Sequence, residues 1–300
     1  MDCRKLQARD EAILERFLAG YAESSMFVRA NLRLSGLDYE DHNYHGEYFG
    51  SFRKDDALNG VIAHYWNGNV MMQAVDEQVL VGLIGSFQNA LSRPVAGILG
   101  PDELAETTIR LLGLTNADYA ANRAEALYAL DLAALVLPSD LDGKRSDMIE
   151  AAAVERNLLG QWIKGYEIEA LGSHDDDDLA VRVADRVEQM VTGSDCWVLA
   201  VDGRPVSLCG FNARLPDMVQ IGPVWTPPEH RSQGYARTLV VLALRKANEQ
   251  GVDKAILFTD YPAAAKAYEA VGFTGIGAFR LALLRTPVEM KDGVWATATN

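Results

Sequence analysis

The order of strand and helix patterns between residues 196 and 284 is the feature that most constrains the fold. Three strand patterns come first, and Asp202-Gly203 between two of them is a hairpin turn signal. A loop with the sequence PEHRSQGYART then leads into an amphipathic helix pattern from about Gly234 to Gln250. A buried strand (AILFTD), a short helix (YPAAAKAYEAV) and a last strand (FRLALL) follow. This alternation predicts a mixed α/β domain.

The first part of the chain predicts a helix followed by short strands. Ala8–Tyr21 has its apolar side chains on one helical face. The runs EYFGSF, LNGVIAHYW, NVMMQAV and PVAGILG are separated by turn signals, so we expect an antiparallel meander. VLVGLIGSFQNAL and PDELAETTIRLLG predict two helices. ALYALDLAALVL fits a helix and a strand equally well.

A polar stretch, Ser139–Asp147, separates two apolar regions and is the best linker candidate. The chain has 300 residues, enough for two domains of about 150 each. We therefore predict domains at 1–138 and 139–300.

After the linker, MIEAAAVERNLLGQWIKGYEIEAL predicts a helix in two pieces, and SHDDDDLAVRVADRVEQMV predicts another. Its acids, Asp175–Asp178, suggest a cap at the helix start rather than a metal site, because four consecutive side chains do not converge on one point.

Composition limits the partners of the chain. A formal net charge of −14 repels nucleic acid and anionic membranes at long range. The three cysteines are widely spaced, and the first residues lack the apolar core of a signal peptide. No run reaches the 18 or so apolar residues of a membrane-spanning helix. We expect a cytoplasmic protein, a monomer or homodimer, without a nucleic-acid or membrane partner and without a metal.

The loop R-S-Q-G-Y-A has the chemistry of an anion site. Backbone N–H groups at a helix start have no intrahelical partners, and the helix dipole favours an anion there. Gly234 has no Cβ to block close approach, and Ala236 keeps the first turn thin. Arg231 and Arg237 add positive charge. On its own the pattern favours an ordinary helix start with two solvated arginines over an anion site. The sequence contains neither GxxxxGK[ST] nor GxGxxG after a first strand.

The surrounding motifs resemble the GNAT family, the GCN5-related N-acetyltransferases. R-S-Q-G-Y-A fits the acyl-CoA loop of that family, [RQ]-x-x-G-x-[GA]. A strand precedes it, and a helix and a buried strand follow it. The later motif A-x-x-x-Y-x-x-x-G-F is present as Ala264, Tyr268, Gly272 and Phe273. The resemblance is strong from about Asp195 to Leu284, and it implies a GNAT fold, a mixed and mostly antiparallel sheet flanked by helices.

This resemblance implies acetyl-CoA as acyl donor. Its diphosphate would bind the amides of residues 233–237, and its pantetheine arm would lie along the strand before the loop. The oxyanion formed during transfer would need a backbone N–H of that strand. The implied cofactor-binding residues are Val224, Trp225, Thr226, Arg231, Ser232, Gln233, Gly234, Tyr235, Ala236, Arg237, Tyr261, Ala264 and Tyr268.

Tyr268 matches the general acid of the family, which protonates the departing thiolate. The alternative is a tyrosine that packs the last helix on the sheet. Seven residues earlier the family often has an asparagine that helps hold the cofactor, and this chain has Tyr261. The general base stays open between Glu229, Asp217, Glu167 and a chain of water molecules.

The first half lacks such a loop, but its order of elements resembles a degenerate GNAT half. SMFVRANLRLSGL and the strands after it are similar to the amino-terminal region of two-domain acetyltransferases. Asp41, His42 and His45 suggest either a metal site or, more simply, a polar loop over a substrate cleft. We expect this half to wall the acceptor site. The aromatic residues that would shape specificity are Tyr39, Tyr44, Tyr48 and Phe49.

The sequence therefore predicts an N-acyltransferase that moves an acetyl group from acetyl-CoA to an amine of a small molecule or peptide. The alternative is a CoA-binding sensor or scaffold with a vestigial site. The Tyr261 departure, the unassigned base and the first half without a loop favour that alternative. Turnover with any amine, lost in Tyr268→Phe, would separate the two.

Overall fold

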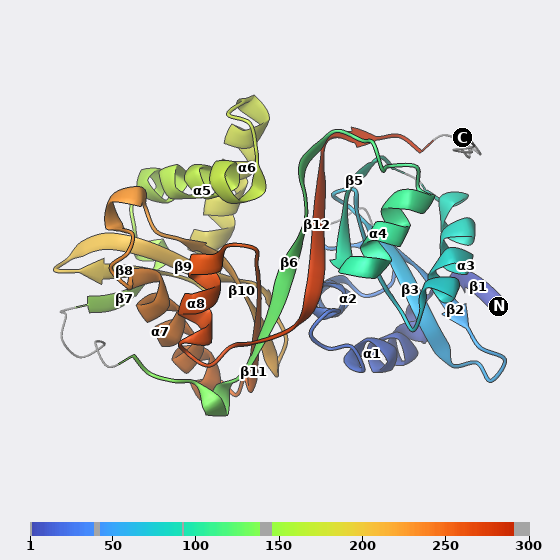
Figure 1. Ribbon diagram of the computed structural model, residues 1–300, viewed down its shortest axis with the longest axis horizontal. Coiled ribbons are helices and arrows are strands. Elements are labelled where there is room, and N and C mark those ends of the chain that lie inside the picture. Colours follow the sequence, from blue (N-terminus) through green and yellow to red (C-terminus); the bar gives the residue numbers. More distant parts are fainter. Residues whose placement is uncertain (1, 39–42, 92, 139–145, 291–300) are drawn as a thin grey trace. The chain divides into compact units, whose positions relative to one another are not determined.

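The computed structural model describes residues 2–38, 43–91, 93–138 and 146–290. Its contacts group the chain into two compact units (Figure 1). The first unit contains residues 1–126 and 277–300, and the second contains residues 127–276. Most of the predicted linker, with Tyr39, Asp41 and His42, lies outside the described residues. The predicted domain boundary at 138/139 therefore stays a prediction.

The sheet of the first unit is mixed. Its strand order is β1-β2-β3-β4-β5-β12-β6. The strands are β1 (Asp2–Lys5), β2 (Gly46–Phe52), β3 (Leu58–Tyr65), β4 (Asn69–Ala74), β5 (Val95–Pro101), β6 (Tyr119–Asp131) and β12 (Thr274–Val288). β1 to β4 are antiparallel neighbours, which confirms the predicted meander for β2, β3 and β4. The meander is wrong for β5, which pairs with β4 in parallel because a helix crosses over between them.

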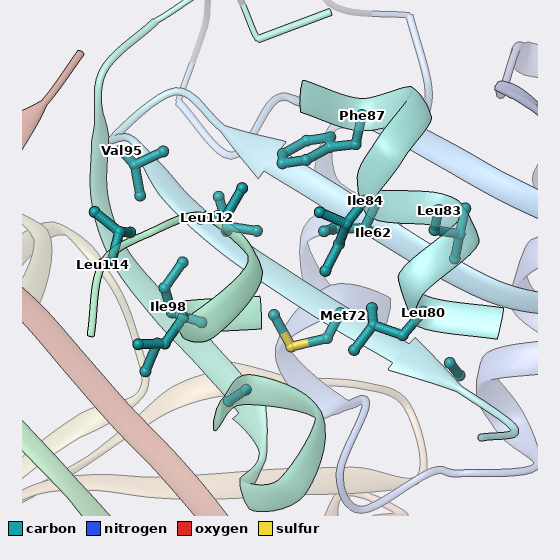
Figure 2. Packing of buried hydrophobic residues seen from close by; sticks show 14 of the residues in the cluster. Ile62, Met72, Leu80, Leu83, Ile84, Phe87, Val95, Ile98, Leu112 and Leu114 are labelled. Atoms are coloured by element: carbon teal, nitrogen blue, oxygen red, sulfur yellow. The ribbon is translucent and has the colours of Figure 1, made fainter. Parts of the chain in front are cut away.

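Helices cover both faces of this sheet. They are η1 (Ala8–Asp10), α1 (Glu11–Ala19), α2 (Met26–Ser35), α3 (Glu77–Gln88) and α4 (Asp102–Leu111). Val61 and Ala63 on β3 pack with α1 and α2, whereas Ile62 between them packs with α3 and α4. Figure 2 shows residues of this second cluster, among them Ile62, Met72 and Leu80. Because side chains of a strand alternate between faces, β3 supplies two separate cores. The sequence reading missed α2.

The second unit has a sheet in the order β6-β11-β10-β9-β8-β7. Its further strands are β7 (Ser146–Glu150), β8 (Cys196–Val201), β9 (Arg204–Arg214), β10 (Met218–Trp225) and β11 (Lys254–Thr259). β7 to β10 are antiparallel neighbours, and β10 and β11 are parallel. Asp202 and Gly203 join β8 to β9 with φ values of 49° and 76°, as the hairpin signal predicts. The mixed, mostly antiparallel sheets with flanking helices confirm the predicted fold class.

Helices also pack on the sheet of the second unit. They are η2 (Leu132–Ala134), η3 (Ala151–Ala153), α5 (Arg156–Leu171), α6 (Asp177–Thr192), η4 (Pro228–His230), α7 (Tyr235–Glu249) and α8 (Pro262–Glu269). α5 and α6 share a core with β8, β9 and β10, and α7 contacts the same three strands. The ambiguous segment 126–137 is a strand and a short helix. The predicted two-piece helix over 148–171 is wrong in its first piece, because residues 146–150 pair with β8.

The acids before α6 cap this helix. Asp176 accepts a hydrogen bond from Leu179 N at 2.8 Å, and Asp177 and Asp178 lie in the first turn. Among the described residues, no three His, Cys, Asp or Glu side chains gather as a metal site. The described helices include none long and apolar enough to cross a membrane.

Candidate functional site

β10 and β11 form a fork. They pair in parallel from Met218 with Lys254 to Gln220 with Ile256. Beyond that point β10 continues to Trp225 along β9, and the described residues show no further pairing with β11. A bulge in β10 accompanies the separation. Because strands that diverge leave backbone N–H and C=O groups unpaired, an extended polar molecule can hydrogen-bond along this edge.

The loop after β10 ends in a helix start without a cap. Ser232 and Gly234 both have left-handed backbone, with φ values of 60° and 80°. Gly234 is the N-cap residue of α7, and the structure shows no side-chain cap there. In the described part of the chain, the backbone N–H groups of Ser232, Gln233, Gly234 and Ala236 have no hydrogen-bond partner. Uncapped amides beside a helix dipole are an anion site.

Arg231 ties this loop to the rest of the unit. Its Nε donates to Thr226 O at 2.9 Å, and its Nη2 donates to Glu169 Oε2 on α5 at 2.8 Å. The guanidinium carbon lies 4.9 Å from the centre of the Trp225 ring. These contacts hold the loop at the end of β10. The prediction that Arg231 also contacts a phosphate stays a prediction, as does the one for Arg237.

The end of β10 is held from both sides. Trp225 packs against α5 at Gly165, where an added Cβ would lie 2.7 Å from the indole ring. On β9, Ser207 Oγ donates to Trp225 O at 3.2 Å and lies 2.9 Å from Thr226 Oγ1. The predicted pantetheine-binding residues Val224, Trp225 and Thr226 therefore form one fixed edge of the fork.

Tyr268 lies on α8 in the same unit. The residue is half-buried, and its ring packs edge-on against Phe273 with centroids 5.9 Å apart. Burial raises the pKa of its hydroxyl well above the ordinary value, and Cys209 and Tyr166 add to the shift. The phenol therefore stays protonated at neutral pH and is available as a hydrogen-bond donor.

Tyr261 and Ala264 lie at the start of α8. Tyr261 is 65 % exposed, and its backbone N–H donates to Thr259 Oγ1 at 3.1 Å. Ala264 is half-buried in the first turn. An exposed aromatic ring at this place is free of core packing, so it can stack on a ligand. The cofactor contacts of both residues remain predictions.

The three candidate bases lie in different places. Glu167 on α5 is buried and accepts a hydrogen bond from Ser173 Oγ at 3.2 Å. Asp217 is exposed next to the start of β10, on the order of 20 Å from Trp225 at about 3.3 Å per strand residue. Glu229 is exposed in η4. Among the three, Glu167 shares a helix with the Gly165 contact of Trp225.

Sequence reasoning missed Gln220, which lies where the fork opens. Its side chain is buried, and its Oε1 has no hydrogen-bond partner in the described part of the chain. Leaving a buried acceptor unpaired costs about 1–3 kcal/mol. One sequence signal was available: a glutamine inside the apolar run V-Q-I of a buried strand.

Comparison with known proteins agrees with this geometry. The model of the acetyltransferase (GNAT) family matches residues 159–273. No curated protein matches the chain. A GCN5-related N-acetyltransferase from Sphaerobacter thermophilus superposes with a TM-score of 0.56 at 14 % identity, covering 96 % of each chain. A GNAT acetyltransferase from Colwellia psychrerythraea gives 0.52 at 13 % identity, covering 94 % of this chain and all of the other.

A third similar structure bears on the two units. It is described as a tandem GNAT protein from the clavulanic acid biosynthesis pathway, and it was solved without AcCoA. It gives a TM-score of 0.54 at 12 % identity and covers 96 % of this chain and 99 % of its own. Because these sequence identities are low, the structural similarities show a shared fold and no more. The family match identifies residues 159–273 as a domain of the GNAT acetyltransferase family, and the fold shared with a tandem GNAT protein over most of the chain supports a two-domain arrangement.

Proposed function

We propose that the second unit binds the CoA thioester of an acyl group and transfers that group to an amine nitrogen. One observation carries the proposal: the amides of Ser232, Gln233, Gly234 and Ala236 are unpaired at an uncapped helix start within the GNAT match. A diphosphate supplies the oxygen atoms that such amides can bind. Acetyl-CoA is the donor that the family most commonly uses.

The fork between β10 and β11 can bind the pantetheine arm of the donor. The pantetheine arm has amide groups, and these pair with the free edge of β10 near Val224 and Thr226 as an added strand would. The Gly165 and Ser207 contacts hold this edge still. A fixed edge keeps the thioester carbonyl in one place, and positioning of this kind lowers the barrier for attack by an amine.

We assign Tyr268 to the thiolate that leaves during the transfer. In the transfer the amine nitrogen bonds to the thioester carbon, the C–S bond breaks, and the sulfur leaves with the electron pair. The ordinary pKa of a thiol is about 8.5, whereas that of the enclosed Tyr268 hydroxyl lies well above its usual value. Full proton transfer to the thiolate is therefore uphill, so Tyr268 acts first by donating a hydrogen bond to it.

The acceptor is an amine of a small molecule or peptide. The net charge of −14 attracts cationic amines over long distances and repels anionic ones. Glu167 or a water chain takes up the proton that the amine loses.

Thermal unfolding with acetyl-CoA tests this proposal. At a ligand concentration of 100 times Kd, binding stabilises the folded state by about 2.7 kcal/mol, so Tm should rise by several degrees. The double variant Arg231→Ala with Gly234→Glu should show no rise. Gly203→Glu is the matched control, because Gly203 also has left-handed backbone with open space around it but lies in the β8–β9 hairpin, outside the loop before α7. An unchanged Tm of the wild type at millimolar acetyl-CoA would refute donor binding.

A CoA-binding sensor is the second candidate, and the exposed Tyr261 at a position where the family often has asparagine favours it. Release of free thiol from acetyl-CoA with an amine present decides between the two. An enzyme should lose about 10²-fold in kcat in Tyr268→Phe. Tyr128→Phe, which removes the hydroxyl bound to Glu269, should keep its rate. A sensor would bind acetyl-CoA and release no thiol with any amine.

A further inference from the structure

Arg231 lies directly before the loop amides that we assign to the diphosphate, and a carboxylate of the protein already engages it. Its Nη2 donates to Glu169 Oε2 at 2.8 Å, and its Nε donates to Thr226 O at 2.9 Å. Its Nη1 has no hydrogen-bond partner in the described part of the chain. A guanidinium has several N–H donors in one plane, so the protein itself occupies only part of the donors of Arg231.

The helix α5 carries Glu169 to this place. Gly165 and Glu169 are four residues apart on α5, so they lie on the same face of the helix. Gly165 contacts the ring of Trp225, since an added Cβ would lie 2.7 Å from the indole. The face of α5 that packs against the end of β10 therefore also brings Glu169 to Arg231.

Both partners of this ion pair are open to solvent. The side chain of Arg231 is 38 % exposed, and that of Glu169 is 55 % exposed. An exposed ion pair contributes little to stability, because water solvates both charges when they separate. A dissolved anion can therefore reach the guanidinium, and separating the pair costs the fold little.

A diphosphate at the loop would compete with Glu169 for Arg231. Ser232 follows Arg231 directly, and its N–H is one of the loop amides without a partner among the described residues. A phosphate can accept parallel hydrogen bonds from a guanidinium as a carboxylate does. A diphosphate carries more negative charge than a carboxylate, so it is attracted more strongly to the same guanidinium. The charge of Glu169 in turn repels the diphosphate.

We propose that Glu169 competes with the diphosphate of the donor for Arg231 and thereby weakens the binding of both acetyl-CoA and CoA. The proposal rests on the proposed function. The diphosphate is present in donor and product and lies away from the reacting carbon. A contact with it therefore stabilises the bound donor, the transition state and the bound product alike. Weakening that contact speeds the release of CoA without changing the chemical step, and product release limits the rate of many enzymes.

Two matched substitutions test this competition. Glu169→Gln removes the competing charge and keeps the length of the side chain. Glu188→Gln is the control, because Glu188 on α6 forms a similarly exposed ion pair with Arg156, outside the loop before α7. Both substitutions change the net charge by the same amount. Acetyl-CoA binding is measured by isothermal titration calorimetry at low and high salt, and CoA dissociation is measured by surface plasmon resonance.

The two variants should respond differently. Glu169→Gln should lower the acetyl-CoA Kd about fivefold, the upper end for an exposed ion pair, and slow CoA dissociation by a similar factor. The gain should shrink at high salt, because salt screens exposed charges. Glu188→Gln should keep the wild-type Kd. Both variants should stay within about 2 °C of the wild-type Tm.

Three results would overturn the proposal. An unchanged Kd in Glu169→Gln would show that Glu169 does not compete with the ligand. A raised Kd would show that Glu169 instead holds the loop in its binding shape. An equal gain in Glu188→Gln would show an effect of net charge alone. Failure of the wild type to bind acetyl-CoA would instead remove the proposed function.

Discussion

Two parallel crossovers in this molecule share a topology and differ at one helix start. In the first unit residues 75–76 connect β4 to α3, and in the second unit residues 226–234 connect β10 to α7. Asp76 caps α3 by accepting from Val79 N at 2.9 Å, with Glu77 in the first turn. α7 begins at Gly234 without a cap and without an acid in its first turn. The first helix start is therefore occupied by the chain's own carboxylates, and the second is open to an external anion.

This difference indicates which helix start can bind an external anion. Each crossover helix has a dipole that favours an anion at its start, but the connecting loop determines whether a side chain of the protein or an external ligand provides that anion. Two connecting residues leave room only for an internal cap. The longer loop with left-handed Ser232 and Gly234 presents several amides at once. Of these two helix starts, the one in the second unit is therefore the candidate anion site.

The largest effect is expected when α7 is given a carboxylate cap like that of α3. In Gly234→Asp a carboxylate would compete for the free amides and repel the diphosphate. We expect at least a 100-fold loss of acetyl-CoA affinity, or about 2.7 kcal/mol, measured by isothermal titration calorimetry. Gly203→Asp in the β8–β9 hairpin is the control for the substitution itself. Wild-type affinity in Gly234→Asp would show that these amides do not hold the ligand.

A buried histidine in the first unit makes the stability of that unit depend on pH. His64 on β3 is 1 % exposed, whereas the described part of the second unit buries no histidine. Burial, with the nearby Arg93 charge, lowers the pKa of His64 to about 4. The unfolded chain binds this proton near pH 6.5, so stability is full above pH 6.5 and falls as pH drops towards 4.

The expected loss between pH 7 and pH 4.5 is about 2 kcal/mol, measured by urea unfolding. His64→Leu should show a shallower slope because no proton is taken up at this site. Equal slopes in the His64→Leu variant and the wild type would contradict this account.

The smallest expected effect comes from removing the internal caps. Asp76→Ala should lower the free energy of unfolding by about 1 kcal/mol and leave the acetyl-CoA Kd unchanged. Asp176→Ala is the matched variant in the second unit, since Asp176 caps α6 through Leu179 N. Both should lower Tm by about 2–4 °C. Acetyl-CoA binding that appears at α3 of Asp76→Ala would mean that the loop length matters less than the cap.

Local patterns were enough to predict the loop and its helix. The glycine at the start of α7 and the apolar stripe that follows it lie within one short segment of the sequence, so neighbouring residues alone were enough to predict them. The capping acids before α6 were predictable for the same reason, because a cap is a contact between near neighbours.

Features that depend on distant residues could not be predicted. The sequence cannot show that Glu169 engages Arg231, or that Ser24 satisfies Gln73 while Gln220 stays unpaired. The pairing of β12 with β5 joins residues far apart in the chain, and so does the parallel pairing of β5 with β4. Such contacts follow from the whole fold, whereas sequence patterns report the preferences of short segments.

A crystal structure with acetyl-CoA bound tests the central claim most directly. The account predicts diphosphate oxygens within hydrogen-bond distance of the backbone N–H groups of Ser232, Gln233, Gly234 and Ala236, with nothing bound at the Asp76 helix start. A diphosphate bound at any other place, with those amides left without it, would contradict the account.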